Sequence, residues 1–143
     1  KDFRVYSLLG DGEIQEGQVW EACMFAAHYK LDNFVVIVDN NGLQIDGAVD
    51  KVMSPYPIVD KLAAFGFHVE AIDGHDFEQI EAALNTAKTV KGQPTAIVMK
   101  TTKGKDISYM ENNAGWHGKA PNDAEYEQAM NELNAILAEL EGN

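Results

Sequence analysis

The sequence is poor in cysteine, in basic residues and in long apolar runs, and each shortage excludes a class of protein. A single cysteine, Cys23, rules out an internal disulfide framework and is typical of a reducing compartment, so we expect a cytoplasmic protein. Eleven Lys and Arg against 23 Asp and Glu give a formal charge of −12, which argues against binding to nucleic acid or to an anionic membrane. Because no apolar run approaches about 18 residues, we expect no membrane-spanning helix.

The length of 143 residues suffices for one domain with a substantial core. Hydrophobic residues make up 45% of the chain and charged residues 24%, which is typical of globular proteins and argues against disorder. The charged first residues lead directly into an apolar run, so we expect no signal peptide. Because the chain opens at Lys1 without an initiator Met, we expect it to be part of a longer polypeptide.

Strand-like and helix-like stretches alternate along the chain. The run Phe34 to Val38 is apolar throughout, which indicates a strand covered on both faces. The expected strands are 4–9, 33–38, 67–72 and 95–100, and the expected helices are 15–29, 54–65, 76–90 and 122–140. This order predicts an α/β fold, a parallel sheet flanked by helices on both faces and joined by right-handed crossovers.

Several residues mark where the expected helices begin and which side chains they bury. Ser54 followed by Pro55 is typical of a helix start, as are Asp76 and Asn122 with a Gln or Glu three residues on. Apolar stripes are expected to pack against the rest of the molecule, one in the third helix and one in the last. These stripes comprise Phe77, Ile80, Leu84, Ala87 and Val90, and Tyr126, Met130, Leu133, Leu137 and Leu140. Residues 102–120 are expected to form a long irregular segment, which in compact domains is often functional.

Two polar clusters come directly after expected strands, Gly10-Asp11-Gly12 and Asn40-Asn41-Gly42. If those strands are neighbours, the Asp11 carboxylate and the Asn41 amide converge at the carboxyl edge of the sheet, where ligands of parallel sheets bind. Such oxygen ligands suit Mg²⁺ or Ca²⁺ and are normally completed by backbone carbonyls, water and substrate phosphates. Gly12 and the start of the next helix would admit a phosphate group. Each cluster is also compatible with a simple tight turn.

The spacing of these clusters resembles the thiamine diphosphate fingerprint, and a longer set of segments resembles transketolase. The similarity covers nearly the whole chain and is closest to the later half of the amino-terminal subunit of split transketolases. The matching segments are Gly10-Asp11-Gly12-Glu13-Ile14-Gln15-Glu16-Gly17, Trp20-Glu21-Ala22, Asp39 to Gly47, Ile72 to Asp76, Lys100 to Gly104 and Trp116-His117-Gly118.

The resemblance implies roles for individual residues. Asp11, Asn41 and the backbone carbonyl of Leu43 match the ligands of Mg²⁺, for which Ca²⁺ is a substitute. Residues matching contacts to thiamine diphosphate are Gly10, Asp11, Gly12, Glu13, Asn41, Ile45 and His117, with Ile45 against the thiazolium ring and Gly12 at the diphosphate. Two residues match catalytic positions: His117 beside the reacting sugar, and Glu16 at a subunit interface. Leu43 and Ile45 are also compatible with core positions, and Glu16 with a solvated helix start.

The implied fold is the diphosphate-binding domain of thiamine diphosphate enzymes. Residues 1–143 would form the later part of that single domain, with the earlier part before Lys1. The implied reaction transfers a two-carbon ketol unit from a ketose phosphate donor to an aldose phosphate acceptor. Because the pyrimidine-binding half of the site is absent from this sequence, we expect no turnover by this chain alone. We expect its partner to be a carboxy-terminal subunit, in a homo- or hetero-oligomer with an exposed sheet edge or an apolar interface.

Three alternatives remain open from the sequence. Deoxyxylulose-phosphate synthase or the α subunit of a 2-oxoacid dehydrogenase would use the same cofactor. A non-catalytic scaffold could keep the same fold, although the presence of Asp11, Gly12 and Asn41 argues against it. A nucleotide-binding Rossmann domain is disfavoured because the first turn lacks Gly-x-Gly-x-x-Gly, with Gln15 at the third glycine position.

Overall fold

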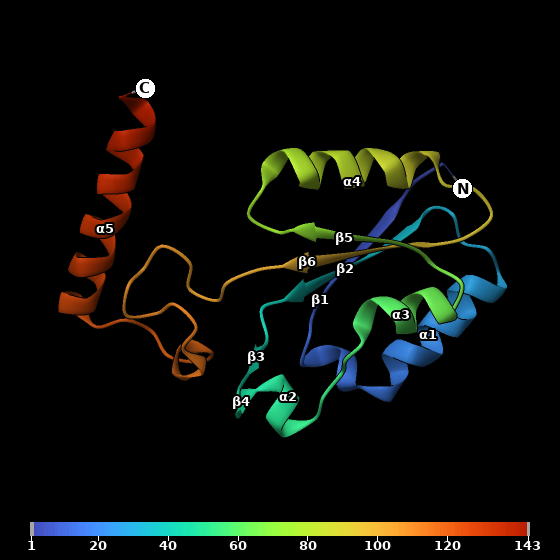
Figure 1. Cartoon of the computed structure of the whole chain (residues 1–143), viewed down its shortest axis with the longest axis horizontal. Helices are drawn as coiled ribbons and strands as arrows, with labels where there is room; N and C mark the ends of the chain where they lie inside the picture. Colours follow the sequence, from blue (N-terminus) through green and yellow to red (C-terminus); the bar gives the residue numbers. More distant parts are fainter. Residues whose placement is uncertain (1, 143) are drawn as a thin grey trace.

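A computed structural model describes residues 2–142 and contains a sheet of four parallel strands (Figure 1). The strands lie in the order β1 (Val5–Gly10), β2 (Phe34–Asn40), β6 (Thr95–Lys100) and β5 (His68–Asp73). The predicted parallel α/β sheet is therefore confirmed, and strand boundaries differ from the expected ones by at most two residues. Because all four strands run in one direction, their carboxyl ends meet at a single edge.

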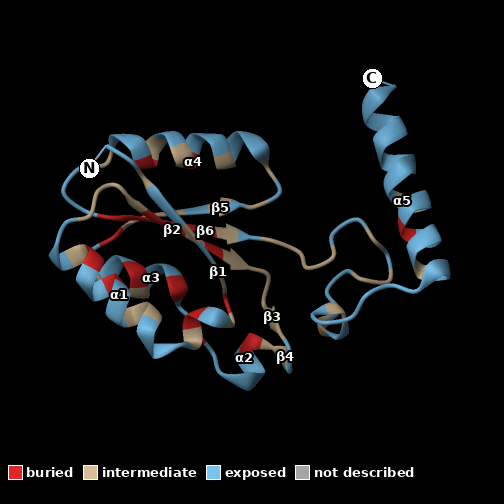
Figure 2. Cartoon of the chain, turned by 180° about the vertical axis from the view of Figure 1, so that it is seen from behind, coloured by how far each residue is buried: buried red, intermediate tan, exposed pale blue. Residues whose placement is uncertain are grey.

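Helices cover both faces of this sheet, as predicted. Helices α1 (Gly17–His28) and α3 (Ile58–Ala64) pack on one face, where Cys23, Ile58 and Leu62 join the alternate residues of β2 and β6 in one core. Helix α4 (Phe77–Thr89) packs on the other face through Ala83 and Ala87 (Figure 2). Cys23 is a core residue, as expected, and its burial raises the pKa of the thiol to about 11.

The starts of the first two helices differ from the sequence prediction. A short 3₁₀ turn, η1 (Glu13–Gln15), precedes α1, so the regular helix begins at Gly17 rather than Gln15. Helix α3 is capped by Pro57 rather than by Ser54. The physical reason is that the ring of Pro57 disfavours helical backbone at the residue before it, so the helix cannot extend back through Tyr56.

A small hairpin between β2 and α3 was not predicted. It pairs β3 (Leu43–Gln44) with β4 (Gly47–Ala48), and the four-residue helix α2 (Val49–Val52) comes directly after it. Strands of two residues are too short to carry a period-2 pattern, so periodicity could not reveal them. The hairpin projects from the carboxyl edge of the sheet (Figure 1).

Helix α4 begins at its expected cap but buries fewer residues than expected. The Asp76 side chain accepts hydrogen bonds from the backbone N–H groups of Glu78 and Gln79, which confirms the predicted cap. Phe77, expected in the packed stripe, is instead 85% exposed. Phe77 occupies the first helical position, shortly after the end of β5, whereas Ala83 and Ala87 lie further along the helix and belong to the core cluster with β2 and β6.

Beyond β6 the chain leaves the sheet. Residues 102–120 form the predicted irregular segment, which includes the 3₁₀ turn η2 (Ala114–Trp116) and leads to helix α5 (Asp123–Glu141). The apolar stripe of α5 was predicted to be packed, and this prediction is wrong: all five of its residues are exposed, and Ala129 is the buried residue of this helix. The physical reason is that α5 stands beside the α/β body and not on the sheet (Figure 1). None of the helices among residues 2–142 is long and apolar enough to span a membrane.

Candidate active site

The two polar clusters meet at the carboxyl edge of the sheet because β1 and β2 are neighbours. Their register pairs Gly10 with Asp39, and the backbone N–H of Asp11 donates to the Asp39 carbonyl at 3.1 Å. The Asp11 carboxylate crosses to the second cluster, where its Oδ2 accepts from the backbone N–H of Gly42 at 2.5 Å. The predicted convergence of Asp11 and the Asn41 turn is therefore present in the structure.

Asp11 is unusual because its carboxylate is buried and only half satisfied. The residue is 1% exposed, and its Oδ1 has no hydrogen-bond partner among the described residues. Burial raises the pKa of this carboxyl above the ordinary value of 3.8, while the nearby backbone N–H groups of Gly42 and Gly12 act in the opposite direction. An unsatisfied buried oxygen is costly, and a bound cation would supply the missing partner.

Around Asp11 lies a cavity of about 460 Å³. Every residue proposed from the resemblance as a cofactor or metal contact lines it, and these residues come from the ends of β1 and β2, the hairpin and the long segment. They are Gly10, Asp11, Gly12, Glu13, Asn41, Leu43, Ile45 and His117, joined by Asp39, Gln44 and Lys103. Residues up to 107 positions apart in the sequence thus share one cavity (117 − 10 = 107).

The turn interpretation of the second cluster is compatible with a site there. Asn41 Oδ1 accepts from the backbone N–H of Leu43 at 2.9 Å, and Gly42 adopts a φ of 81°, which favours glycine. The polar cluster is therefore a tight turn whose side-chain oxygen lies at the cavity. Ile45, in the hairpin turn, is 69% exposed, so the alternative that it is a core residue is wrong.

Gly12 has a structural reason to be glycine that the sequence did not show. A Cβ at this position would lie 2.9 Å from the Cβ of Gln44, closer than side chains approach. Gln44 is held there by a hydrogen bond from the Gln15 side-chain amide at 2.6 Å. The absence of a side chain at Gly12 therefore lets the hairpin close against the first cluster and form one wall of the cavity.

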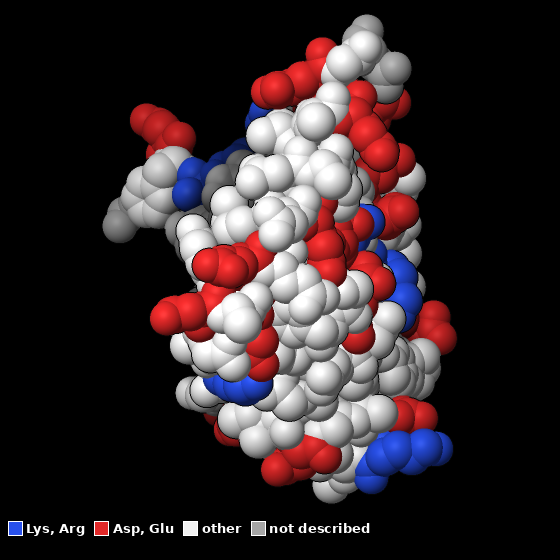
Figure 3. All heavy atoms as spheres, turned by 90° about the vertical axis from the view of Figure 1, so that its left-hand side faces the viewer, with Lys and Arg blue, Asp and Glu red and all other residues white. Residues whose placement is uncertain are grey.

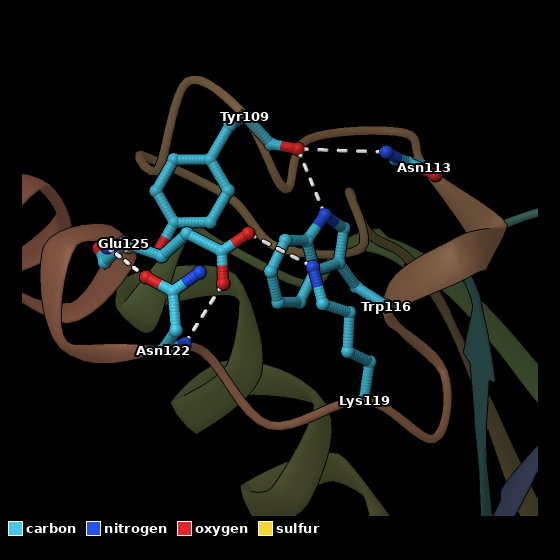
Figure 4. A network of polar contacts seen from close by, with 6 residues as sticks. All are labelled: Tyr109, Asn113, Trp116, Lys119, Asn122 and Glu125. Atoms are coloured by element: carbon cyan, nitrogen blue, oxygen red, sulfur yellow. Dashed lines mark hydrogen bonds and ion pairs between the residues drawn. The ribbon is translucent and has the colours of Figure 1, made fainter.

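The far wall of the cavity belongs to residues 102–120. Gly104 has a φ of 67°, and a Cβ added to it would lie only 2.6 Å from the Cβ of Met110, so the two backbone segments approach closely here. His117 donates its backbone N–H to the Ala114 carbonyl at 2.9 Å in the η2 turn. The neighbouring Trp116 indole donates to the Tyr109 carbonyl at 2.9 Å, which fixes the turn that carries His117 (Figure 4).

Three residues that line the cavity were not predicted as site residues, Asp39, Gln44 and Lys103, and Lys103 is the basic one among them. Lys103 lies in the segment Lys100 to Gly104 that carried part of the resemblance, yet no role was inferred for it. The available signal was its place three residues past the end of β6 (103 − 100 = 3), beside Gly104. A lysine beyond the carboxyl end of a parallel strand is well placed to meet an anion.

Glu16 is the one predicted site residue that lies outside this cavity. It is exposed and precedes α1 without a side-chain hydrogen bond to the helix end. The residues that line the cavity in the described chain do not include it, so its role at a subunit interface stays a prediction.

The charges of the cavity determine which kind of ligand fits. Asp11, Glu13 and Asp39 face Lys103 and His117, so the lining carries more negative than positive charge at neutral pH. A diphosphate alone would be repelled by these carboxylates, whereas a divalent cation bound to them would reverse the sign. No group of three His, Cys, Asp or Glu residues in the described chain could hold a metal by itself. The oxygen set of Asp11, Asn41 and the Leu43 carbonyl suits Mg²⁺ completed by ligand phosphates.

Fold and site together define an α/β domain with a cavity, lined by carboxylate and amide side chains, at the carboxyl edge of a parallel sheet. Residues 1–135 match the family model described as "Transketolase, thiamine diphosphate binding domain". The chain belongs to this family, which confirms the resemblance inferred from its motifs.

Individual relatives agree with this assignment. The chain is 40% identical over 140 residues to an apulose-4-phosphate transketolase subunit from Phocaeicola vulgatus, covering 98% of this chain and 50% of that protein. It is 49% identical over 119 residues to human transketolase, covering 82% of this chain and 18% of that protein. The structure superposes on transketolase from Campylobacter jejuni with a TM-score of 0.86 and 36% identity, covering 93% of this chain and 21% of that one.

The chain thus spans about half the length of the relatives that are named as subunits and a fifth of the single-chain transketolases. The similarity covers the carboxyl-edge site, because both polar clusters and the His117 segment fall within residues 1–135.

Proposed function

We propose that this chain carries the diphosphate- and metal-binding part of a transketolase that depends on Mg²⁺ and thiamine diphosphate. The observation that supports this most strongly is Asp11, a buried carboxylate with one unpartnered oxygen, lining a cavity that it shares with Asn41 and Leu43. A buried unpaired charge lowers stability, so its presence is best explained by a cation that it binds.

In this proposal the chain's own residues bind and orient the cofactor. The Asp11 carboxylate, the Asn41 side-chain oxygen and the Leu43 carbonyl hold Mg²⁺, or Ca²⁺ in its place, since all three are hard oxygen ligands. The backbone of Gly10 to Glu13 and the ammonium group of Lys103 receive the diphosphate. Ile45, which presents an exposed apolar side chain at the hairpin turn, packs against the thiazolium ring.

Thiamine diphosphate, when bound, supplies the stabilised carbanion that makes and breaks carbon–carbon bonds next to a carbonyl. The imidazole of His117 has the chemistry to hold or move a proton at a substrate hydroxyl. The segment that carries it, fixed by Trp116 and Tyr109, keeps the imidazole at the cavity wall. The substrates we propose are sugar phosphates, a ketose donor and an aldose acceptor.

We further propose that activity requires a second chain. Three of the relatives are named as transketolase subunits, which implies a partner, here a carboxy-terminal subunit with the pyrimidine-binding domain. Glu16, exposed before α1, would meet the neighbouring active site in a homo- or hetero-oligomer. The 143-residue chain alone is expected to show no ketol transfer, and measurable transfer by the pure chain would contradict this.

The proposal is tested by thermal unfolding with thiamine diphosphate, with and without Mg²⁺. Wild type should gain stability only when both are present, because ligands that bind the folded state raise its melting temperature. Asp11→Asn should lose this gain. Asp46→Asn removes the same charge from an exposed position in the hairpin turn and should keep it. A wild type that shows no Mg²⁺-dependent gain, or an Asp11→Asn variant that keeps it, would overturn the proposed site.

A further inference from the structure

Helix α5 makes little contact with the α/β body. It stands beside the body in Figure 1, and Figure 2 shows it exposed along its length except near Ala129. Most of the stability of a helix in a protein comes from tertiary packing rather than from helix propensity, and this holds for the 19 residues of α5. Something must therefore hold it, and the contacts it makes lie on one side.

That side faces residues 108–119. The Tyr109 hydroxyl donates to the Glu125 carbonyl at 2.6 Å, and the Ser108 hydroxyl donates to the Glu132 carboxylate at 2.6 Å. Lys119 bonds Glu125 at 2.8 Å while lying 4.0 Å from the centre of the Trp116 ring (Figure 4). The long segment thus clamps α5 through Glu125 and Glu132, which lie seven positions, or about two helical turns, apart (132 − 125 = 7).

The apolar stripe of α5 lies on a different side from this clamp. Tyr126, Met130, Leu133, Leu137 and Leu140, which we call the α5 stripe, step by four and three residues and so form one line along the helix. Each of the five is at least 36% exposed, and Leu140 is 70% exposed. Five large apolar side chains in one exposed line are typical of a binding surface.

Charge specifies which kind of partner can cover the stripe. Helix α5 contains six acidic and no basic residues between Asp123 and Glu141. By helical geometry Asp123, Glu127 and Glu141 border the stripe on the side away from the clamp. Figure 3, which views the molecule from the α5 side, shows acidic side chains bordering uncharged surface. A second copy of this chain would bring a second helix of the same charge, on a molecule of charge −12, against the first.

We propose that the α5 stripe is a docking surface for a different chain, one whose contacting surface is apolar and edged by Lys or Arg. This inference rests on the proposed function, in which that chain is the carboxy-terminal transketolase subunit. The apolar contact supplies affinity, and the acidic border orients the partner and excludes self-association. Glu125 and Glu132 remain bonded to residues 108–119, so the partner binds a helix whose position relative to His117 is already fixed.

The experiment measures binding of this chain to the purified carboxy-terminal transketolase subunit from the same genome, by biolayer interferometry. The double variant Leu133→Gln/Leu137→Gln should raise Kd by about tenfold or more, because exposed leucines at the centre of an interface are removed. Ala135→Gln, on the opposite side of α5, should bind as wild type does. Far-UV circular dichroism establishes that both variants keep the helix.

A second measurement tests the charge. Glu127→Gln should weaken binding about two- to threefold at low salt and flatten its dependence on NaCl, since rim charges act mainly through screened attraction. Glu81→Gln, an exposed acidic residue of α4, should leave both unchanged.

Each other outcome overturns the proposal. Equal binding by wild type and the stripe variant, or no binding by wild type, removes α5 as the docking surface. Sedimentation of the chain alone as a dimer that the stripe variant abolishes would assign the stripe to a second copy. The Mg²⁺ and thiamine diphosphate test is made without the partner, so failure here and failure of the cofactor site are told apart.

Discussion

At the scale of single residues, Asp11 shows how a binding site lowers the stability of the fold that contains it. Its carboxylate leaves water for a buried position with one hydrogen bond from a backbone N–H and one oxygen unpartnered among the described residues. The protonated form is favoured by this burial, so the pKa lies above its ordinary value in the folded chain. The folded chain without a cation is therefore less stable at neutral pH than it would be with a neutral side chain there.

The first prediction concerns this cost. In metal-free buffer at pH 7, Asp11→Asn should raise the free energy of unfolding by about 1 kcal/mol, within the range for a buried unsatisfied group. The folded state binds more protons than the unfolded state between the ordinary and the raised pKa. Wild type therefore loses stability as pH rises through that window, and the gap between the proteins narrows as pH falls toward 3.8. Urea unfolding across this pH range measures it.

The control for this prediction is Asp46→Asn, which removes the same charge at an exposed position and should change stability little at any pH. A variant Asp11→Asn that is less stable than wild type at pH 7 would show that the bond from Gly42 outweighs the cost of burial.

The second prediction concerns Gly12. Gly12→Ala should lower the free energy of unfolding by about 1–3 kcal/mol, because its Cβ would meet the Cβ of Gln44 at 2.9 Å and neither atom is at a flexible end. Gly10→Ala, whose Cβ would meet nothing within 4 Å, is the matched control. Thermal unfolding of the two variants measures the difference, and equal melting temperatures would contradict a steric role for Gly12.

The sequence predicted the cavity residues well where chain position alone determined them. Asp11 and Asn41 come after strands, and parallel strands deliver the residues beyond their carboxyl ends to one edge, so their meeting was foreseeable. The contact between Gly12 and Gln44 was not, because it depends on a hairpin with two-residue strands. Lys103 was missed because its segment is irregular, and no periodicity fixes where an irregular segment folds back.

At the scale of secondary structure, α4 and α5 begin with the same kind of cap but differ in the packing that the cap supports. Asp76 caps α4, which packs on the sheet through Ala83 and Ala87. Asn122 caps α5 in a capping box, in which its side chain accepts from the Glu125 N–H and Glu125 accepts from the Asn122 N–H. Since α5 buries little, its cap supports the helix and not the core.

The third prediction contrasts these caps. Asp76→Ala should lower the global free energy of unfolding by about 1 kcal/mol, because α4 unfolds with the sheet. Asn122→Ala should instead increase amide hydrogen exchange in the first turn of α5, about fivefold for a similar energy, and leave global unfolding nearly unchanged. Exchange mass spectrometry and urea unfolding of both variants test this; a fall in global stability for Asn122→Ala would show that α5 is part of the cooperative core.

Helices were predicted more reliably than their packing. Periodicity and caps located α4 and α5, because these signals are local in sequence. Whether a stripe is covered depends on which element lies across from it, and nothing local distinguishes the buried stripe residue Ala87 from the exposed stripe residue Leu140. The start of α3 could have been placed from Pro57 alone, since the residue before a proline is disfavoured in a helix.

At the scale of the whole molecule, the sheet is incompletely covered at β1. Adjacent strands are about 4.8 Å apart, so a single helix about 10 Å wide, such as α4, cannot cover four of them. Tyr6 and Leu8 lie in register with Val35 and Ile37 on that face, and Leu8 is 66% exposed. On the opposite face a recess of about 290 Å³ opens between β1 and α1 beside Leu9 and Cys23. The expected exposed sheet edge is therefore present.

The fourth prediction concerns this edge. An exposed apolar edge strand promotes association between chains, so the isolated chain should aggregate in a concentration-dependent way near its melting temperature. Leu8→Lys should slow this aggregation severalfold without lowering stability, because the side chain already lies in solvent. Light scattering during a thermal ramp measures it. Phe77→Lys, a change at an exposed position far along the sheet on α4, provides the control and should aggregate as wild type does.

The order of the strands also bears on how the chain is made. The strand between β2 and β5 is β6, the last of the four along the chain. During synthesis β2 is complete at Asn40, whereas its second neighbour, β6, begins only at Thr95, 55 positions later (95 − 40 = 55). Until then Val35 and Val38, fully buried in the finished fold, have only β1 beside them. Assembly of this domain on the ribosome is therefore a late event, because the sheet is complete only when β6 inserts between β2 and β5. The same step brings the segment with Lys103 and His117 to the carboxyl edge of the sheet.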